Sequence, residues 1–136
     1  MMISTKGRYA LRVMLDLARQ PESGYVPLAE IAARQRISEK YLESILTVLS
    51  KAGMLRALRG KGGGYRLAKA PEEYSVYEIL SLTEGTLAPV TCLEAGQSCE
   101  NSGACSTYPL WKGLDETVRN YLSSFTLCDV LRMKQE

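Results

Sequence analysis

Three cysteines within 14 residues are the side chains of this 136-residue chain best suited to chemistry. Cys92, Cys99 and Cys105 follow the spacing Cys-x6-Cys-x5-Cys in a polar stretch. This spacing differs from the CxxC pairs of structural zinc sites and from the common ferredoxin arrangements. Three thiols this close can still converge on one soft metal centre. The spacing alone therefore leaves three alternatives open: an iron–sulfur cluster, a zinc site or a thiol redox switch.

The composition argues against enzymatic chemistry and against a membrane protein. The chain contains no histidine, which removes the commonest general base and the histidine-containing triads and zinc motifs. No apolar run approaches the roughly 18 residues of a membrane span, and the N-terminal sequence has no signal-peptide pattern. We therefore expect a cytoplasmic protein, in which cysteines are more often ligands or redox thiols than disulfides.

Charge divides the chain into two unlike halves. Residues 1–70 carry 13 Lys and Arg against 5 Asp and Glu, a local charge of +8, whereas residues 71–136 carry 4 against 10, a local charge of −6. A basic half indicates a surface that binds a polyanion, and a random surface imbalance is the alternative.

The basic half is predicted to begin with three helices. The first covers about Thr5–Arg19, and the second starts after Pro27. Ser38 can cap the third helix, and Gly53 ends it. Apolar residues occupy positions i, i+3, i+4 and i+7 of the third helix, namely Leu42, Ile45, Leu46 and Leu49. The second and third helices form a helix-turn-helix, although an ordinary αα-hairpin has the same pattern.

A glycine-tipped basic hairpin follows the helix pair. Met54–Arg59 and Tyr65–Lys69 are predicted strands, separated by the glycine-rich segment Gly60–Gly64. The basic residues around this tip are Arg56, Arg59, Lys61 and Arg66. A flexible, solvated hairpin is the alternative, but it does not account for the preceding helix pair. The arrangement is typical of a winged helix, whose wing contacts phosphates or the minor groove, and it predicts nucleic-acid binding.

The acidic half is predicted to hold two further helices around the cysteine segment, and a brief terminal helix. The first begins at a capping box, Ser75–Glu78, and ends at Gly85. The second begins near Pro109, and its large apolar residues are spaced 3, 4, 3 and 4: Trp111, Leu114, Val118, Tyr121 and Phe125. This spacing predicts a two-fold dimer seam, with a helix lying on its own core as the alternative.

Several short motifs occur in order along the whole chain. They are Ser4–Ala10, Met14–Asp16, Val26–Ala29, Ile37–Ser38, Tyr41–Glu43, Arg59–Gly60, Gly62–Tyr65, the three cysteines and Leu110–Trp111. In this order and spacing they resemble the IscR-type winged-helix regulators, a family that includes nitric-oxide and cysteine-metabolism regulators. The resemblance implies a [2Fe–2S] cluster held by Cys92, Cys99 and Cys105. It also implies that the holo protein represses genes of cluster assembly and that cluster scarcity lifts the repression.

The fourth ligand is where the chain departs from this family. The IscR pattern places a histidine three residues after the third cysteine, where this chain has Tyr108; nitric-oxide-sensing relatives use an aspartate of the first helix, where this chain has Arg8. The candidates are Tyr108, Glu94, Glu100 or an exogenous thiol, and an oxygen or exchangeable ligand implies a more labile cluster. Cys128 is expected instead to be a small buried residue of the last helix.

The predicted fold is mainly α with a small β-hairpin wing: a winged helix-turn-helix followed by a long C-terminal dimerisation helix. We expect a DNA-binding domain at residues 1–85, a cluster-binding loop at 86–108, and the dimerisation and terminal helices at 109–136. A homodimer would present its two recognition helices to half-sites of a double-stranded operator about one DNA turn apart.

The expected DNA contacts come from the first and third helices and the wing. The residues are Arg8, Lys40, Tyr41, Glu43, Ser44, Lys51, Arg59 and Lys61. The cations would neutralise phosphates, and Arg59 would enter a narrow minor groove. Glu43 either accepts from a base or is a solvated acid paired with Lys40 or Thr47. The resemblance implies the first role, because the matching glutamate discriminates between operator classes.

Other functions fit parts of the pattern. Within the same family, the alternative is a regulator of cysteine metabolism or of a nitrosative or redox response. Outside it, a small electron-transfer iron–sulfur protein or redox enzyme would use the cysteines but leaves the glycine-tipped basic hairpin unexplained. A zinc-containing adaptor domain would bind metal without sulfide.

Overall fold

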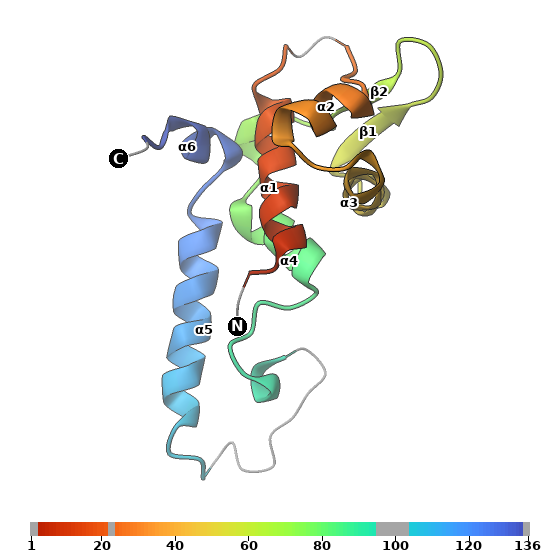
Figure 1. The fold of residues 1–136 in the computed structure, drawn as a ribbon. Helices are drawn as coiled ribbons and strands as arrows, with labels where there is room; N and C mark the ends of the chain where they lie inside the picture. The colour runs from red at the N-terminus through yellow and green to blue at the C-terminus, as the bar shows by residue number, and fades with distance from the viewer. Residues whose placement is uncertain (1–2, 22–23, 95–103, 135–136) are drawn as a thin grey trace.

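The computed structural model describes residues 3–21, 24–94 and 104–134, and it places a long helix beside an N-terminal winged helix-turn-helix (Figure 1). In chain order, the elements are α1 (Thr5–Ala18), α2 (Leu28–Gln35), α3 (Glu39–Lys51), β1 (Leu55–Leu58), β2 (Gly64–Leu67), the 3-10 turn η1 (Pro71–Glu73), α4 (Val76–Glu84), the 3-10 turn η2 (Thr91–Leu93), α5 (Tyr108–Ser123) and α6 (Leu127–Arg132). The predicted fold class is confirmed. Among the described helices, none has the length and apolar character to cross a membrane.

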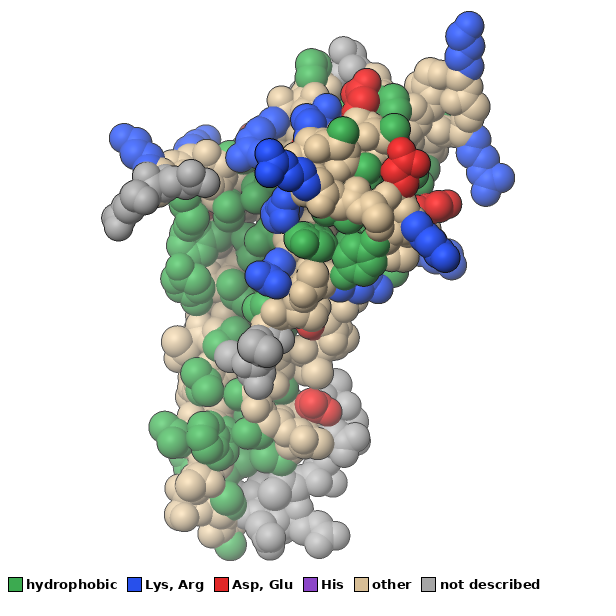
Figure 2. Space-filling model, viewed as in Figure 1, with side chains coloured by type: hydrophobic (Ala, Val, Ile, Leu, Met, Phe, Trp, Pro, Cys, Tyr) green, Lys and Arg blue, Asp and Glu red, His purple; other side chains and the backbone are tan. Residues whose placement is uncertain are grey.

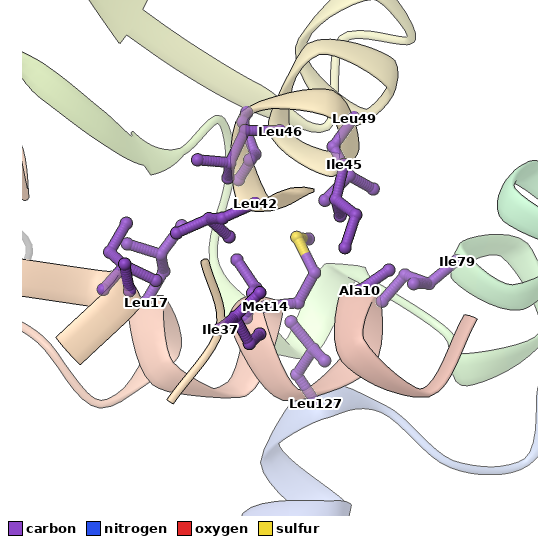
Figure 3. Packing of buried hydrophobic residues seen from close by; sticks show 14 of the residues in the cluster. Ala10, Met14, Leu17, Ile37, Leu42, Ile45, Leu46, Leu49, Ile79 and Leu127 are labelled. Atoms are coloured by element: carbon purple, nitrogen blue, oxygen red, sulfur yellow. The ribbon is translucent and has the colours of Figure 1, made fainter. Parts of the chain in front are cut away.

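Helices α1 and α3 form the centre of the core (Figure 3). Both begin at a serine: the Ser4 hydroxyl accepts the Gly7 N–H at 3.1 Å, and the Ser38 hydroxyl accepts the Tyr41 N–H at 3.2 Å. The predicted apolar face of α3 is fully buried and packs with Ala10 and Met14 of α1. This packing leaves the opposite, polar face of α3 in solvent.

The wing is anchored at its base by Tyr74, which is wholly buried. Its hydroxyl donates to the Met54 carbonyl at 2.6 Å and accepts the N–H groups of Ala68 and Lys69 at 3.0 and 3.2 Å. Burial raises the pKa of Tyr74, so the hydroxyl stays protonated and continues to donate. One side chain therefore joins the start and the end of the hairpin to the core.

Helix α5 packs chiefly against α4 and lies away from α2, α3 and the hairpin (Figure 1). None of its residues is buried in the single chain. The chain then returns to the core, where Leu127 of α6 is wholly buried and its N–H bonds the Tyr74 carbonyl at 3.2 Å. The two ends of α5 therefore lie in different surroundings, the cysteine segment at one end and the core at the other.

The apolar stripe of α5 is shorter than its sequence spacing predicts. The helix ends at Ser123, so Phe125 does not lie on it, and that part of the prediction is wrong. The Phe125 ring instead meets the Tyr121 ring edge-on, with centroids 4.9 Å apart. It packs against a second small core formed by Val76, Leu80 and Leu87. The hydroxyl of Ser124 bonds back to the Tyr121 carbonyl at 2.6 Å and marks this end.

A carboxylate joins the end of α4 to the start of α1. Glu84 Oε1 accepts both the N–H and the hydroxyl of Ser4, at 3.0 and 2.6 Å. The absence of a side chain at Gly7 makes room, because a Cβ there would collide with the Glu84 carboxylate. The first helix is thus held at the point where the chain leaves α4 toward the cysteines.

Asp16 is a buried acid that ties α1 to α2. Its side chain is 4% exposed, and the Arg34 guanidinium donates to both of its oxygens, at 2.8 and 3.0 Å. Gln35 adds a third hydrogen bond at 2.7 Å. Burial alone would raise the pKa of Asp16, but the hydrogen bonds from Arg34 and Gln35 outweigh it, and the pKa lies below its ordinary value.

Replacing Asp16 with alanine is expected to lower the free energy of unfolding by about 3 kcal/mol, because two partly buried donors lose their acceptor. The control is Glu30→Ala, whose carboxylate meets the same Arg34 at 3.6 Å on the surface; we expect a change below about 1 kcal/mol. Since the pKa of Asp16 is lowered, its contribution is complete above the ordinary value of 3.8 and is lost as pH falls through the folded-state pKa. Denaturant unfolding at pH 7 and pH 3 measures both effects, and equal destabilisation by the two variants would contradict the assignment.

Candidate nucleic-acid interface and cysteine segment

The outer face of α3 is polar and exposed. Lys40, Glu43, Ser44 and Lys51 all lie on it in solvent. In the described part of the chain the Glu43 carboxylate has no hydrogen-bond or ion-pair partner, and the Thr47 hydroxyl donates at 2.8 Å to the Glu43 backbone carbonyl instead. The suggested pairing of Glu43 with Lys40 or Thr47 is therefore not found. An unpaired acid on this face can accept from a base amino group or reject a wrong base.

Tyr41 differs from its neighbours on α3 because it is partly buried. Its ring meets the Tyr9 ring edge-on, with centroids 5.9 Å apart. The Arg12 guanidinium lies over the Tyr9 ring, 5.0 Å from its centroid, and donates a hydrogen bond to the Gln35 carbonyl at 2.6 Å. This cluster fixes the start of α3 and leaves only part of Tyr41 available to a ligand.

Arginines extend this surface along α1. Arg8 is exposed, and its guanidinium donates to the Thr5 hydroxyl at 3.3 Å. Arg12 lies one turn further along the same helix, next to the turn between α2 and α3. The two cations continue the positive charge of the helix-turn-helix toward the N-terminus.

The wing adds a second group of cations, and Lys and Arg side chains project from it at the upper right of Figure 2. The hairpin between Met54 and Ala70 contains five basic residues and no acidic one. Arg56, Arg59 and Lys61 are exposed, and none of them has a carboxylate partner among the residues that the structure describes. Unneutralised charge on a narrow arm favours contact with a polyanion.

The 3-10 turn η2 and the start of α5, which carry or adjoin two of the three cysteines, lie at the opposite end of the molecule from the wing (Figure 1). Cys92 is in η2 and Cys105 stands just ahead of α5, and both are partly exposed. Cys99 and Glu100 lie outside the described residues. Within the ranges 3–21, 24–94 and 104–134, no three His, Cys, Asp or Glu side chains form a metal site. The three-cysteine site therefore stays a prediction.

Cys105 has a thiol suited to ligation. Its sulfur lies 3.3 Å from the Thr107 hydroxyl oxygen. Hydrogen bonds from the Thr107 hydroxyl, and then from the backbone N–H groups of Thr107 and Tyr108, lower the pKa of Cys105. The thiolate is the form of cysteine that binds metal.

Two of the predicted alternative ligands are near the cysteines. Tyr108 is the first residue of α5, is partly buried, and donates its N–H to the Cys105 carbonyl at 3.3 Å. Glu94 follows η2, two residues after Cys92. Cys128 is in α6, beyond the other end of α5. It is partly exposed and donates to Glu72 at 3.2 Å, which raises its pKa, so the prediction of a buried apolar role is wrong.

Comparison with known proteins identifies the family of this chain. The model of the Rrf2 family, described as an iron-dependent transcriptional regulator, matches residues 3–133. The chain belongs to the Rrf2 family. It is 36% identical to the HTH-type transcriptional regulator IscR of Pectobacterium atrosepticum over 135 residues, which are 99% of this chain and 82% of that one.

Solved structures agree with this Rrf2 assignment. The global cysteine regulator CymR of B. subtilis superposes with a TM-score of 0.81 and 34% identity, covering 99% of both chains. IscR of T. potens superposes with a TM-score of 0.76 and 34% identity, covering all of this chain and 94% of the other. The protein is thus a winged-helix transcriptional regulator, a DNA-binding and not an enzymatic class.

For an Rrf2 regulator, the described structure adds one cation that the sequence prediction missed. Arg12 lies on α1 one turn after the predicted contact Arg8 and beside the turn between α2 and α3. Its spacing from Arg8 on a helix was the signal that could have found it. Arg56 and Arg66, already expected near the wing tip, lie directly opposite each other in the hairpin register, which sequence alone does not fix.

Proposed function

We propose that this Rrf2 protein is a homodimeric, cytoplasmic repressor that senses an iron–sulfur cluster and controls genes of cluster biogenesis. The observation that carries the proposal is the place of the cysteines. They lie on the connection between α4, which belongs to the winged helix, and α5, whose apolar side faces solvent. A centre bound there is in a position to act on both the winged helix and the dimer.

The dimer is supported by the exposed side of α5. Leu110, Leu114 and Tyr121 are 64%, 38% and 59% exposed in the single chain. Hydrophobic side chains gather along this helix in Figure 2. An exposed apolar stripe on a helix is a surface for a partner, and a two-fold axis would bring two copies of it together. Two wings and two α3 helices would then bind successive half-sites of one operator.

Cys92 and Cys105, the two described cysteines of the segment, have thiols that suit an iron–sulfur cluster as ligands. Cys92 is in η2 and Cys105 precedes α5, on either side of residues 95–103. Both η2 and the start of α5 lie at the end of the molecule away from the wing (Figure 1). The lowered pKa of Cys105 favours the thiolate. We propose that Cys92, Cys99 and Cys105 hold a [2Fe–2S] cluster, with Tyr108, Glu94 or Glu100 as candidates for the remaining position. Such a cluster would supply sensitivity to iron, sulfide and oxidants.

The contact between Glu84 and Ser4 offers a route from this segment to the DNA-binding surface. Glu84 precedes the cysteine segment, and α1 carries Arg8 and Arg12. A centre that favours one arrangement of α4 by a few kcal/mol can shift the population of DNA-binding conformers. The likeness to CymR supports one alternative in the same family, a regulator of cysteine metabolism.

The test is binding of duplex DNA selected from a random pool by the wild-type protein, with and without its metal centre. Arg59→Ala is expected to weaken binding about tenfold and to lower the slope of log affinity against log salt by about 1, because one phosphate or groove contact is lost. Lys134→Ala, an exposed cation near the C-terminus, is the control. Binding of Arg59→Ala that equals wild type across a salt series would contradict the winged-helix interface. Equal affinity of the holo and apo forms would contradict cluster sensing.

A further inference from the structure

One large apolar side chain is exposed on the wing. Leu58 is 48% exposed, in a hairpin whose other exposed side chains are largely basic. Among the residues that the structure describes, the other large exposed apolar side chains lie on α5 or near the C-terminus, namely Leu110, Leu114, Tyr121 and Met133. The dimer proposed above accounts for those on α5 but not for Leu58.

The register explains why Leu58 is uncovered. Leu55 points into the core, so Arg56 and Leu58 point to the opposite face of the hairpin. The residue paired with Leu58 is Gly64, which has no side chain to cover it. Leu58 therefore stands at the end of the hairpin ladder, on the same face as Arg56.

The same face carries unneutralised charge. Arg56 is paired directly with Arg66, and like charges at such a position destabilise a hairpin. Among the described residues neither has a carboxylate partner; Arg66 only lies over the Tyr25 ring, 4.9 Å from its centroid. Arg59 and Lys61 follow Leu58 at the tip. Leu58 is therefore an apolar side chain with cations near it in the hairpin. Such a surface is complementary to a ligand that has an apolar part flanked by anions.

Close backbone contacts constrain the base of the tip at Gly63 and Gly64. A Cβ at Gly63 would collide with the Leu58 carbonyl, and a Cβ at Gly64 would collide with the Val26 carbonyl. Gly63 donates its N–H to the Gly60 carbonyl at 3.0 Å, and Tyr65 exchanges two hydrogen bonds of 2.9 Å with Val26. Glycine is required at these close approaches. The leucine is thus presented on an ordered turn, which lowers the entropy cost of a contact.

We infer that Leu58 enters the minor groove beside Arg59 and packs on deoxyribose faces, as an apolar affinity determinant of the wing. This inference rests on the proposed DNA-binding function. Sugar faces in the minor groove are apolar and lie between two rows of phosphates, which matches a leucine with Arg56 on the same face and Arg59 next in the chain. Proteins that use the minor groove frequently insert apolar side chains of this kind. The contact would favour narrow or easily deformed sites, since the fit depends on groove width.

The test compares Leu58→Ser with wild type on the duplex that the wild type selects from a random pool. Affinity is expected to fall about tenfold, the loss of one buried apolar contact. The salt slope should stay unchanged, because no charge is removed, in contrast to Arg59→Ala. Leu58→Ile keeps the apolar surface and is expected to bind within about twofold of wild type.

Met133→Ser is the matched control, because Met133 is 50% exposed and far along the chain from the wing. It should leave affinity unchanged, and neither variant should alter the melting temperature. If Leu58→Ser binds the duplex as tightly as wild type, the inference is overturned and Leu58 becomes a candidate contact for a protein partner. The proposed function would not be affected by that result. Failure of the wild type to select any duplex would overturn the proposed function itself.

Discussion

Replacing Leu114 with glutamate is expected to convert the proposed homodimer into a monomer and to lower operator affinity at least about 100-fold. Leu114 is 38% exposed on α5, between Leu110 and Tyr121, which are more exposed still. In a two-fold dimer the substitution occurs twice, so two carboxylates would be buried near each other without partners. Loss of the dimer removes the advantage of binding two linked half-sites, which is worth about 10²–10⁴ in affinity.

Sedimentation equilibrium measures the mass, and a fluorescence-anisotropy titration measures the affinity. Asn120→Glu places the same charge on an exposed polar position of the same helix and should stay dimeric. A Leu114→Glu protein that keeps the dimer mass and the wild-type affinity would place the interface elsewhere.

Replacing Cys105 with serine is expected to remove nearly all iron and acid-labile sulfide from protein purified without oxygen. Wild type should carry iron and sulfide in near-equal amounts. A serine hydroxyl does not form the anion that a soft metal centre needs, whereas hydrogen bonds from Thr107 and Tyr108 already favour the Cys105 thiolate. Because the start of α5 lies at the opposite end of the molecule from the wing (Figure 1), the variant should still bind duplex DNA in a salt-dependent way, with the affinity of the apo form.

Cys128→Ser is the matched control for this measurement, because its thiol donates to Glu72 at the other end of α5. It should keep the full iron and sulfide content. Zinc without sulfide, or no metal in the wild type, would end the cluster proposal and leave the winged helix with a thiol switch or a partner protein as its signal. A reversible redox couple without duplex binding would favour the electron-transfer alternative.

Sequence was sufficient for the helix-turn-helix and the wing because their signals are local. The spacing from Leu42 to Leu49 assigns the buried face of α3, and Ser38 marks where the helix begins. The glycines between the two strands mark the wing. Each of these features depends on residues within one or two turns of the chain.

Contacts between distant residues were beyond such reasoning. The hydrogen bonds of Asp16 join residues 18 and 19 positions apart, and no local pattern marks an acid that will be buried. The end of α5 was misplaced because heptad spacing continues through Phe125 although the backbone has already left the helix at Ser123. The cysteine spacing follows no common motif, so by itself it left an iron–sulfur cluster, a zinc site and a thiol redox switch open.

The burial of Leu127 has a consequence for how the chain acquires its fold. The winged helix at the N-terminal side completes its core with a side chain that comes after α5 in the sequence. During synthesis, the residues around Tyr74 and Met14 therefore remain partly open to water until position 127 has been made. A chain that ended within α5 would lack this side chain, and the core of the winged helix would contain a cavity at its place. Leu127 thereby makes the core of the winged helix depend on a residue that follows α5 in the chain.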